Sequence, residues 1–115
     1  MGRVKILKAS AGSGKTYQLA YEYIRSVIDS PQLYRHILAV TFTNKATEEM
    51  KQRIVGELNA LANGSPSGYR GDLERDLGLD GQTIRRRAAD ARTKILHDYS
   101  RFTVLTIDKF FQRII

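Results

Sequence analysis

The sequence predicts an α/β fold in which parallel strands alternate with flanking helices. Three short apolar runs, at residues 4–9, 36–42 and 102–107, have the length and composition of buried strands. Between these runs, apolar residues recur at the spacing of an amphipathic helix. Because a helix is the usual crossover between parallel strands, this alternation indicates a mostly parallel sheet. Ligands of such sheets bind at the carboxyl ends of the strands.

The helices can be placed by their apolar stripes and end signals. The first should run from Lys15 to Ser30-Pro31, and the second should end at Asn63-Gly64. Thr83 is a suitable N-cap for the third helix and Asp108 for the last one. The apolar residues expected to face the core are Leu19, Ala20, Tyr23, Ile24, Val27 and Ile28; Ala46, Met50, Ile54, Leu58 and Leu61; and Ile84, Ala88, Ala91, Ile95 and Tyr99.

The chain divides into three segments. Residues 1–63 hold the first two strands and helices, and residues 82–115 hold the third helix and the third strand. Residues 64–81 contain five of the nine glycines, so we expect a loop there, with a short helical turn around Leu73 to Leu77 as an option. At 115 residues the chain corresponds to one domain or to one piece of a larger one.

Composition restricts the class of protein. There is no cysteine, which excludes disulfides and cysteine metal sites, and no apolar run approaches the roughly 20 residues that span a bilayer. We therefore expect no membrane partner and a cytoplasmic or nucleoid location. The 19 basic and 12 acidic residues give a net charge of +7, which favours a polyanionic partner. A solubilising surface charge explains this excess equally well.

The strongest motif is Ala9-Ser10-Ala11-Gly12-Ser13-Gly14-Lys15-Thr16, a phosphate loop (P-loop) between a strand and a helix. Gly12 and Gly14 allow the turn in which backbone N–H groups point at a phosphate. The helix adds its N-terminal N–H groups and the positive end of its dipole. Lys15 should reach the β- and γ-phosphates, and the Thr16 hydroxyl should bind magnesium.

Polar and aromatic residues follow the other two strands. Thr41, Phe42, Thr43 and Asn44 offer hydroxyls, an amide and a ring beside a helix start, the groups that hold a phosphodiester and stack a base. Phe42 could instead be a core residue, and Thr43 or Asn44 could be a helix cap. The segment 106–113 again combines a hydroxyl, a basic residue and aromatic rings at the end of a strand. Its two adjacent Phe residues are, however, more typical of packing in a core than of base stacking. The arginines at 85–87 form either a solvated face or a DNA contact.

Three segments resemble motifs I, Ia and Ib of superfamily 1 helicases of the UvrD/Rep kind. They are ASAGSGKT at 9–16, TFTNKATEEMKQRI at 41–54 and VLTIDKFF at 104–111. The short N-terminus before the P-loop is most similar to the AddA/RecB branch of recombination nucleases. Two positions depart from the family pattern. Thr47 stands where Ala is common, and Asp108-Lys109 replaces the usual His-Ser.

The resemblance implies part of a RecA-like P-loop NTPase domain, in an ATP-driven motor that moves on single-stranded DNA. Its cofactors would be ATP and Mg²⁺, its catalytic lysine Lys15 and its magnesium ligand Thr16. Its partners would be single-stranded DNA, the rest of a helicase chain and a nuclease subunit. The phosphate contacts would be Ser10, Ala11, Gly12, Ser13, Gly14, Lys15 and Thr16, and the DNA contacts Thr41, Phe42, Thr43, Asn44, Thr106 and Ile107.

No acidic pair follows the third strand before Ile115. Such a pair anchors magnesium and activates water in these enzymes. We therefore expect an N-terminal segment of a longer helicase-nuclease that does not hydrolyse ATP alone. Two alternatives remain at this stage. A small P-loop nucleotide kinase would leave TFTNKA unexplained, and a non-catalytic DNA-binding module would leave the P-loop unexplained.

Overall fold

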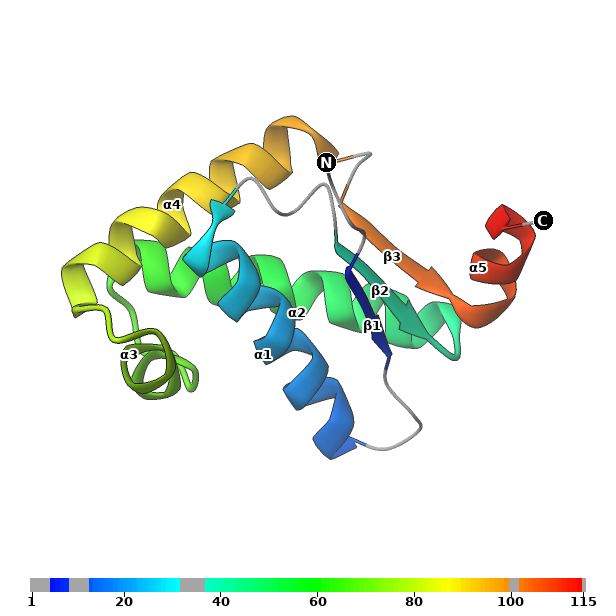
Figure 1. Ribbon diagram of the computed structural model, residues 1–115, viewed down its shortest axis with the longest axis horizontal. Helices are drawn as coiled ribbons and strands as arrows, with labels where there is room; N and C mark the ends of the chain where they lie inside the picture. The colour runs from blue at the N-terminus through cyan, green and yellow to red at the C-terminus, as the bar shows by residue number, and fades with distance from the viewer. Residues whose placement is uncertain (1–4, 9–12, 32–36, 100–101, 115) are drawn as a thin grey trace.

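The computed structural model describes residues 5–8, 13–31, 37–99 and 102–114. Within these ranges three strands alternate with five helices (Figure 1). The elements are β1 (Lys5–Lys8), α1 (Ser13–Asp29), β2 (Ile37–Thr41), α2 (Asn44–Asn63), α3 (Arg70–Leu77), α4 (Gly81–His97), β3 (Thr103–Thr106) and α5 (Ile107–Ile114).

The three strands form a parallel sheet in the order β1-β2-β3. Lys8 pairs with Val40, and Thr41 pairs with Thr106, so the carboxyl ends of all three strands lie at one edge. The parallel arrangement predicted from the alternation of strands and helices is therefore observed. Right-handed crossovers between strands in this order place α1 and α2 on the same face of the sheet.

The core lies between that face and the helices. Ile37 and Ala39 of β2 pack into one buried cluster with the apolar stripes of α1, α2 and α4. The predicted core residues of the three long helices are buried, except that Ala46 is half-buried and Tyr99 lies beyond the end of α4 and is 45% exposed. Helix α4 packs mainly on α2 and α1 and forms an outer layer beyond them (Figure 1).

The segment 64–81 is more ordered than the glycine count suggests. It contains a complete helix, α3, whose Leu73 is buried in the core. Gly64 and Gly78 end α2 and α3 in the left-handed conformation, with φ of 74° and 63°. The helical turn considered around Leu73 to Leu77 is therefore confirmed as part of α3, which begins three residues earlier than expected. The full length of this helix was not predicted, because glycines that end helices resemble the glycines of a loop in sequence.

Several helix starts also differ from prediction. Asp80, and not Thr83, is the N-cap of α4, because its carboxylate accepts a hydrogen bond from the Thr83 N–H at 2.7 Å. This bond lowers the pKa of the Asp80 carboxyl. Helix α1 begins at Ser13, two residues before Lys15. Among the described residues, no helix has the length and apolar character needed to cross a membrane.

Candidate nucleotide and DNA site

The phosphate loop lies between β1 and α1. Ser10, Ala11 and Gly12 fall outside the described residues, whereas Ser13, Gly14, Lys15 and Thr16 form the first turn of α1. The side chains of Lys15 and Thr16 are also outside the description. The first N–H groups of a helix lack partners within the helix, and the first turn of α1 has no acidic residue. This backbone arrangement fits a bound phosphate.

The strand ends bring two further sequence segments to the same edge. Because Thr41 and Thr106 are register partners, the segment after β2 and the segment after β3 start side by side. The loop after β1 begins one strand away, since Lys8 pairs with Val40. We expected the loops after the three strands to share one edge of the sheet. The carboxyl ends of the three strands, from which these loops start, do lie at one edge.

Thr41 is a structural residue at this edge. It is 3% exposed, and its Oγ1 lies 2.7 Å from the Oγ1 of Thr47 on α2. Thr47 also donates to the Thr43 carbonyl at 3.1 Å. These bonds tie the end of β2 to the first turn of α2. A buried Thr41 hydroxyl with these partners supports the loop from inside.

Thr43 is the N-cap of α2. Its backbone is extended (φ −132°, ψ 159°), and its Oγ1 accepts a hydrogen bond from the Ala46 N–H at 3.0 Å. The capping role considered for Thr43 is therefore confirmed. Thr43 and Asn44 are both exposed, so their surfaces face solvent at the start of the helix. The first turn of α2 has no acidic residue to oppose an anion there.

Phe42 is an exposed aromatic residue between β2 and α2. Its exposed fraction is 53%, although both neighbouring elements are packed. The interpretation of Phe42 as a core residue is therefore wrong. An aromatic ring held in solvent beside a helix start is an available stacking surface.

The third segment places Thr106 and Lys109 beside these residues. Thr106 is buried, and its Oγ1 accepts a hydrogen bond from the Lys109 N–H at 3.3 Å. Helix α5 already begins at Ile107, so the expectation that Asp108 caps it from Lys109 was wrong. Ile107 lies on the helix, and its side chain is outside the description. Lys109 is exposed.

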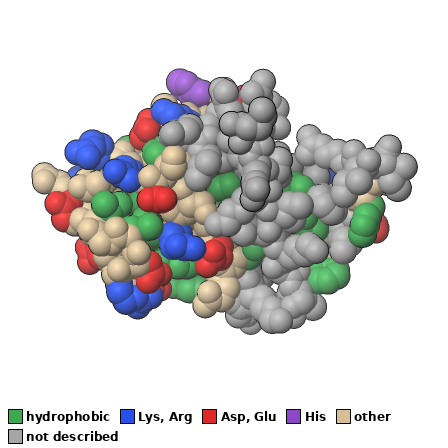
Figure 2. All heavy atoms as spheres, viewed as in Figure 1, with side chains coloured by type: hydrophobic (Ala, Val, Ile, Leu, Met, Phe, Trp, Pro, Cys, Tyr) green, Lys and Arg blue, Asp and Glu red, His purple; other side chains and the backbone are tan. Residues whose placement is uncertain are grey.

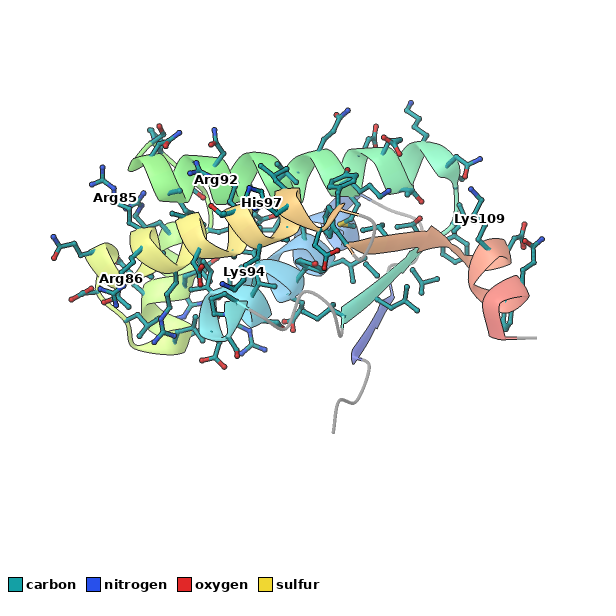
Figure 3. The ribbon with its side chains drawn as sticks, turned by 90° about the horizontal axis from the view of Figure 1, so that it is seen from above. Arg85, Arg86, Arg92, Lys94, His97 and Lys109 are labelled. Atoms are coloured by element: carbon teal, nitrogen blue, oxygen red, sulfur yellow. The ribbon has the colours of Figure 1, made fainter. Side chains whose placement is uncertain are left out.

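A hollow of about 290 Å³ lies between α2 and the end of β3. It brings together the starts of two helices, α2 and α5, and two lysines, Lys51 and Lys109. Figure 3 shows Lys109 at the start of α5. Sequence reasoning did not select Lys51, although Lys51 follows Thr47 by one helical turn and therefore shares its face. The described lining residues are Asn44, Thr47, Glu48, Lys51, Val104, Thr106 and Lys109.

The charges of this hollow suit a phosphate more than a metal ion. Lys51 and Lys109 are cationic, and helix N-termini carry partial positive charge. Glu48 is the single acidic residue among the described lining residues. In the described part of the chain, no group of three or more His, Cys, Asp or Glu side chains could hold a metal ion.

A pair of tyrosines fixes the start of α1. Tyr69 donates from its hydroxyl to the Tyr17 carbonyl at 3.1 Å, and Tyr17 donates to the Gly68 carbonyl at 3.1 Å. Their ring centroids are 4.5 Å apart. Burial raises the pKa of Tyr69 to about 12. These contacts attach the segment before α3 to the residue that follows the P-loop, a link that the scattered tyrosines of the sequence did not suggest.

Comparison with known proteins agrees with this geometry. The family model of the UvrD/REP helicase N-terminal domain matches residues 2–115. The RecB protein of the RecBCD enzyme of Mycolicibacterium smegmatis is 34% identical over 110 residues, which cover 93% of this chain and 10% of that protein. An ATP-dependent helicase/nuclease subunit of Lactobacillus delbrueckii is 31% identical over 110 residues, 96% of this chain and 8% of that protein. No solved structure matches the chain.

The family match over residues 2–115 identifies a helicase-type domain. The chain belongs to the UvrD/REP helicase N-terminal domain family. It spans about a tenth or less of the length of the two relatives named above. The resemblance stated from motifs I, Ia and Ib is thereby confirmed at the level of the family.

Proposed function

We propose that this chain is the N-terminal ATP-binding segment of an ATP-dependent translocase or helicase that acts on single-stranded DNA. The observation that carries the proposal is the pairing of Thr41 with Thr106 at the carboxyl ends of β2 and β3. An exposed ring (Phe42), the starts of α2 and α5, and two lysines therefore lie at the same edge of the sheet as the end of β1, where the phosphate loop begins. The family match supports the RecA-like P-loop architecture for this arrangement.

In this proposal ATP is held by the phosphate loop. The triphosphate lies at the N-terminus of α1 and contacts backbone N–H groups from Ser10 to Thr16, with Lys15 on the β- and γ-phosphates. The Thr16 hydroxyl would hold the magnesium ion that accompanies ATP, and this ion would neutralise phosphate charge. Tyr69 and Tyr17 hold the first turn of α1 in place for this contact.

Single-stranded DNA is held at the ends of β2 and β3. Phe42 stacks on a base, since a ring with more than half of its surface exposed can accept any base face. The sugar–phosphate backbone of the DNA lies beside two pairs of residues: Thr43 and Asn44 at the start of α2, and Thr106 and Ile107 at the start of α5. Lys51 and Lys109 pair with its phosphates.

Turnover of ATP needs groups that these 115 residues do not contain. Their sequence has no acidic pair after the third strand to anchor magnesium and accept the proton of water. We propose that the chain binds ATP without hydrolysing it unaided. Steady-state ATPase activity of the 115-residue chain that is abolished by Lys15→Ala would contradict this.

The relatives suggest the wider assembly. One is named as part of a RecBCD enzyme and the other as part of a helicase/nuclease, so we propose that the whole protein works with further helicase domains and a nuclease subunit in the cytoplasm. The nucleotide kinase and the non-catalytic module remain the competing functions. A nucleotide kinase would not need Phe42 in solvent, and a module would not need the phosphate loop.

Titration of fluorescently labelled single-stranded DNA tests the DNA part. The proposal predicts binding that weakens with salt, with a slope of about −0.7 per phosphate contact in a plot of log affinity against log salt concentration. Phe42→Ala should reduce the affinity. Absence of binding at low salt would contradict the proposal and favour the nucleotide kinase.

A further inference from the structure

A basic seam runs along the surface where α4 packs on α2. The two helices are antiparallel, because Lys51 of α2 lies over the ring of Tyr99 (5.5 Å to its centroid), while near the other end Arg85 donates to the Ala62 carbonyl at 3.3 Å. Between them Arg92 donates to Asn59 Oδ1 at 2.8 Å. We call Lys51, Asn59, Arg85, Arg92, Leu96 and Tyr99 the α2–α4 seam.

The α4 side of the seam is one stripe of the helix. Arg85, Arg92 and Leu96 are separated by seven and four positions, so these three residues fall on the same flank of α4. Tyr99 follows the end of the helix and is placed at the seam by its contact with Lys51 of α2. Leu96 and Tyr99 are 51% and 45% exposed. Asp90, the acidic residue of α4, falls by the same spacing on the opposite flank, and Asp98 is the C-cap of the helix.

The other arginines of the run have different environments. Arg87 donates to the carbonyls of Ile28 and Asp29 at 3.3 and 3.0 Å and so fixes the end of α1. Arg86 and Lys94 lie on the other side of α4 from Arg85 and Arg92 (Figure 3). The three arginines of the run therefore have different roles: Arg87 fixes the end of α1, Arg86 points away from the seam, and Arg85 belongs to the seam. The sequence alone does not distinguish these roles.

The charge of the seam differs from that of the neighbouring face. In the view of Figure 2, basic and acidic side chains are interspersed over the helices. Among the described residues, four ion pairs join basic and acidic side chains: Arg25 with Glu22, Arg75 with Asp72 and with Asp76, and Lys94 with Asp90. The seam as defined has three cations and no acidic member, with Glu48 beside Lys51 in the adjoining hollow.

The seam continues the proposed DNA site. Lys51 belongs to the seam, lies over the ring of Tyr99 and also lines the hollow between α2 and β3, so the hollow and the seam share this residue. From Lys51 to Ala62 the path along α2 is about 16 Å, at roughly 1.5 Å per helical residue. At about 3.4 Å per stacked nucleotide, this length accommodates four to five nucleotides.

We propose that a single DNA strand extends from the hollow along the α2–α4 seam. Its phosphates pair with Arg85 and Arg92, and its bases lie on Leu96 and Tyr99. Each guanidinium has five donors, and the bonds to Ala62 and Asn59 use Nε of Arg85 and Nη1 of Arg92, so both groups are held at the surface with donors to offer. This inference rests on the proposed DNA site and extends it.

The test is fluorescence anisotropy with labelled oligothymidylates of two lengths, about 5 and about 15 nucleotides. Arg85→Gln/Arg92→Gln keeps an amide donor at each position and removes two charges. Arg86→Gln/Lys94→Gln on the other side of α4 is the matched control with the same charge loss (Figure 3). Thermal unfolding of both variants reports whether the fold is kept, and Arg85→Lys/Arg92→Lys restores the charge.

We expect the seam variant to bind the long oligonucleotide on the order of tenfold more weakly than the control variant does, with a salt slope smaller by about 1.4 for two lost contacts. The short oligonucleotide should bind all variants alike, and the lysine variant should recover most of the affinity. Equal losses in seam and control variants, or no loss in either, would overturn the inference while leaving the hollow as the DNA site. If the unaltered chain binds neither oligonucleotide, the proposed function fails as well.

Discussion

Thr41 and Thr106 are direct Cα partners at the carboxyl ends of β2 and β3, and both are buried. Both hydroxyls have hydrogen-bond partners within the protein: Thr41 bonds to Thr47, and Thr106 accepts a hydrogen bond from the Lys109 N–H. The two threonines therefore set the shape of the edge. Phe42 and Lys109, which lie beside them, are exposed and available to contact a ligand.

The Thr41–Thr47 bond should contribute measurably to stability. Thr47→Val keeps the shape of the side chain but removes the hydroxyl that bonds to Thr41 and to the Thr43 carbonyl. We expect a loss of about 1 kcal/mol in the free energy of unfolding, measured by urea titration. Thr47→Ser, which keeps the hydroxyl, should lose less. Equal losses for the two variants would show that packing, and not the hydrogen bond, matters at this position.

The N-cap of α2 predicts a second stability change. Thr43→Ala removes the acceptor of the Ala46 N–H and should cost about 1 kcal/mol, whereas Thr43→Ser should be close to the unaltered chain. DNA affinity measured on the same two variants separates the roles of the residue. If Thr43→Ser keeps stability but loses affinity, the methyl group contributes to binding. If Thr43→Ala is as stable as the unaltered chain, the cap assignment is wrong.

Phe42 should matter for binding and not for folding. Because the ring is more than half exposed, Phe42→Ala should change the free energy of unfolding by less than about 0.5 kcal/mol. Loss of one base–ring stack should weaken single-stranded DNA binding on the order of tenfold. Phe42→Tyr keeps the ring and serves as the control. A large loss of stability in Phe42→Ala, or unchanged affinity, would contradict the stacking role.

Tyr69 predicts a loss of stability at high pH. Burial raises the pKa of its hydroxyl to about 12 in the folded chain, above its ordinary value of about 10. The neutral form is thus favoured by folding, so this stabilisation is complete below about pH 10 and is lost as the pH rises towards 12. Tyr69→Phe should have a shallower decline between about pH 10 and 12 in urea titrations.

Tyr69→Phe also removes the bond to the Tyr17 carbonyl, so at neutral pH it should be less stable by about 1 kcal/mol. Tyr21 supplies the comparison, because burial and its bond to Asp76 raise its pKa as well. Tyr21→Phe should flatten the alkaline decline in the same way. A decline that is as steep in Tyr69→Phe as in the unaltered chain would mean that Tyr69 does not titrate in this range.

The sequence predicted the elements whose signals are local and periodic. The stripes of α1, α2 and α4 identified most of the core, and apolar runs identified the strands, because burial on one face repeats at the period of the element. The segments after β2 and β3 could be assigned to one edge because parallel strands align their carboxyl ends. These inferences depend on spacing alone.

What could not be predicted depends on contacts between distant residues. The cap of α4 lies at Asp80 and that of α5 at Thr106, since several polar residues near each start could serve and packing selects one. Lys51 enters the site because α2 turns its face towards the end of β3. The bonds of Tyr69 to Tyr17 join residues 52 positions apart, which no local pattern reports.

The most direct test of the central claim is binding of a fluorescent, non-hydrolysable ATP analogue in the presence of Mg²⁺. Lys15→Ala should weaken this binding on the order of tenfold or more, because a charge-assisted contact to the triphosphate is lost. Lys45→Ala, an exposed lysine on α2, is the control and should bind like the unaltered chain. Saturable binding that depends on Lys15 is the predicted result. Binding that is equal in all three proteins, or absent from the unaltered chain, would contradict the account.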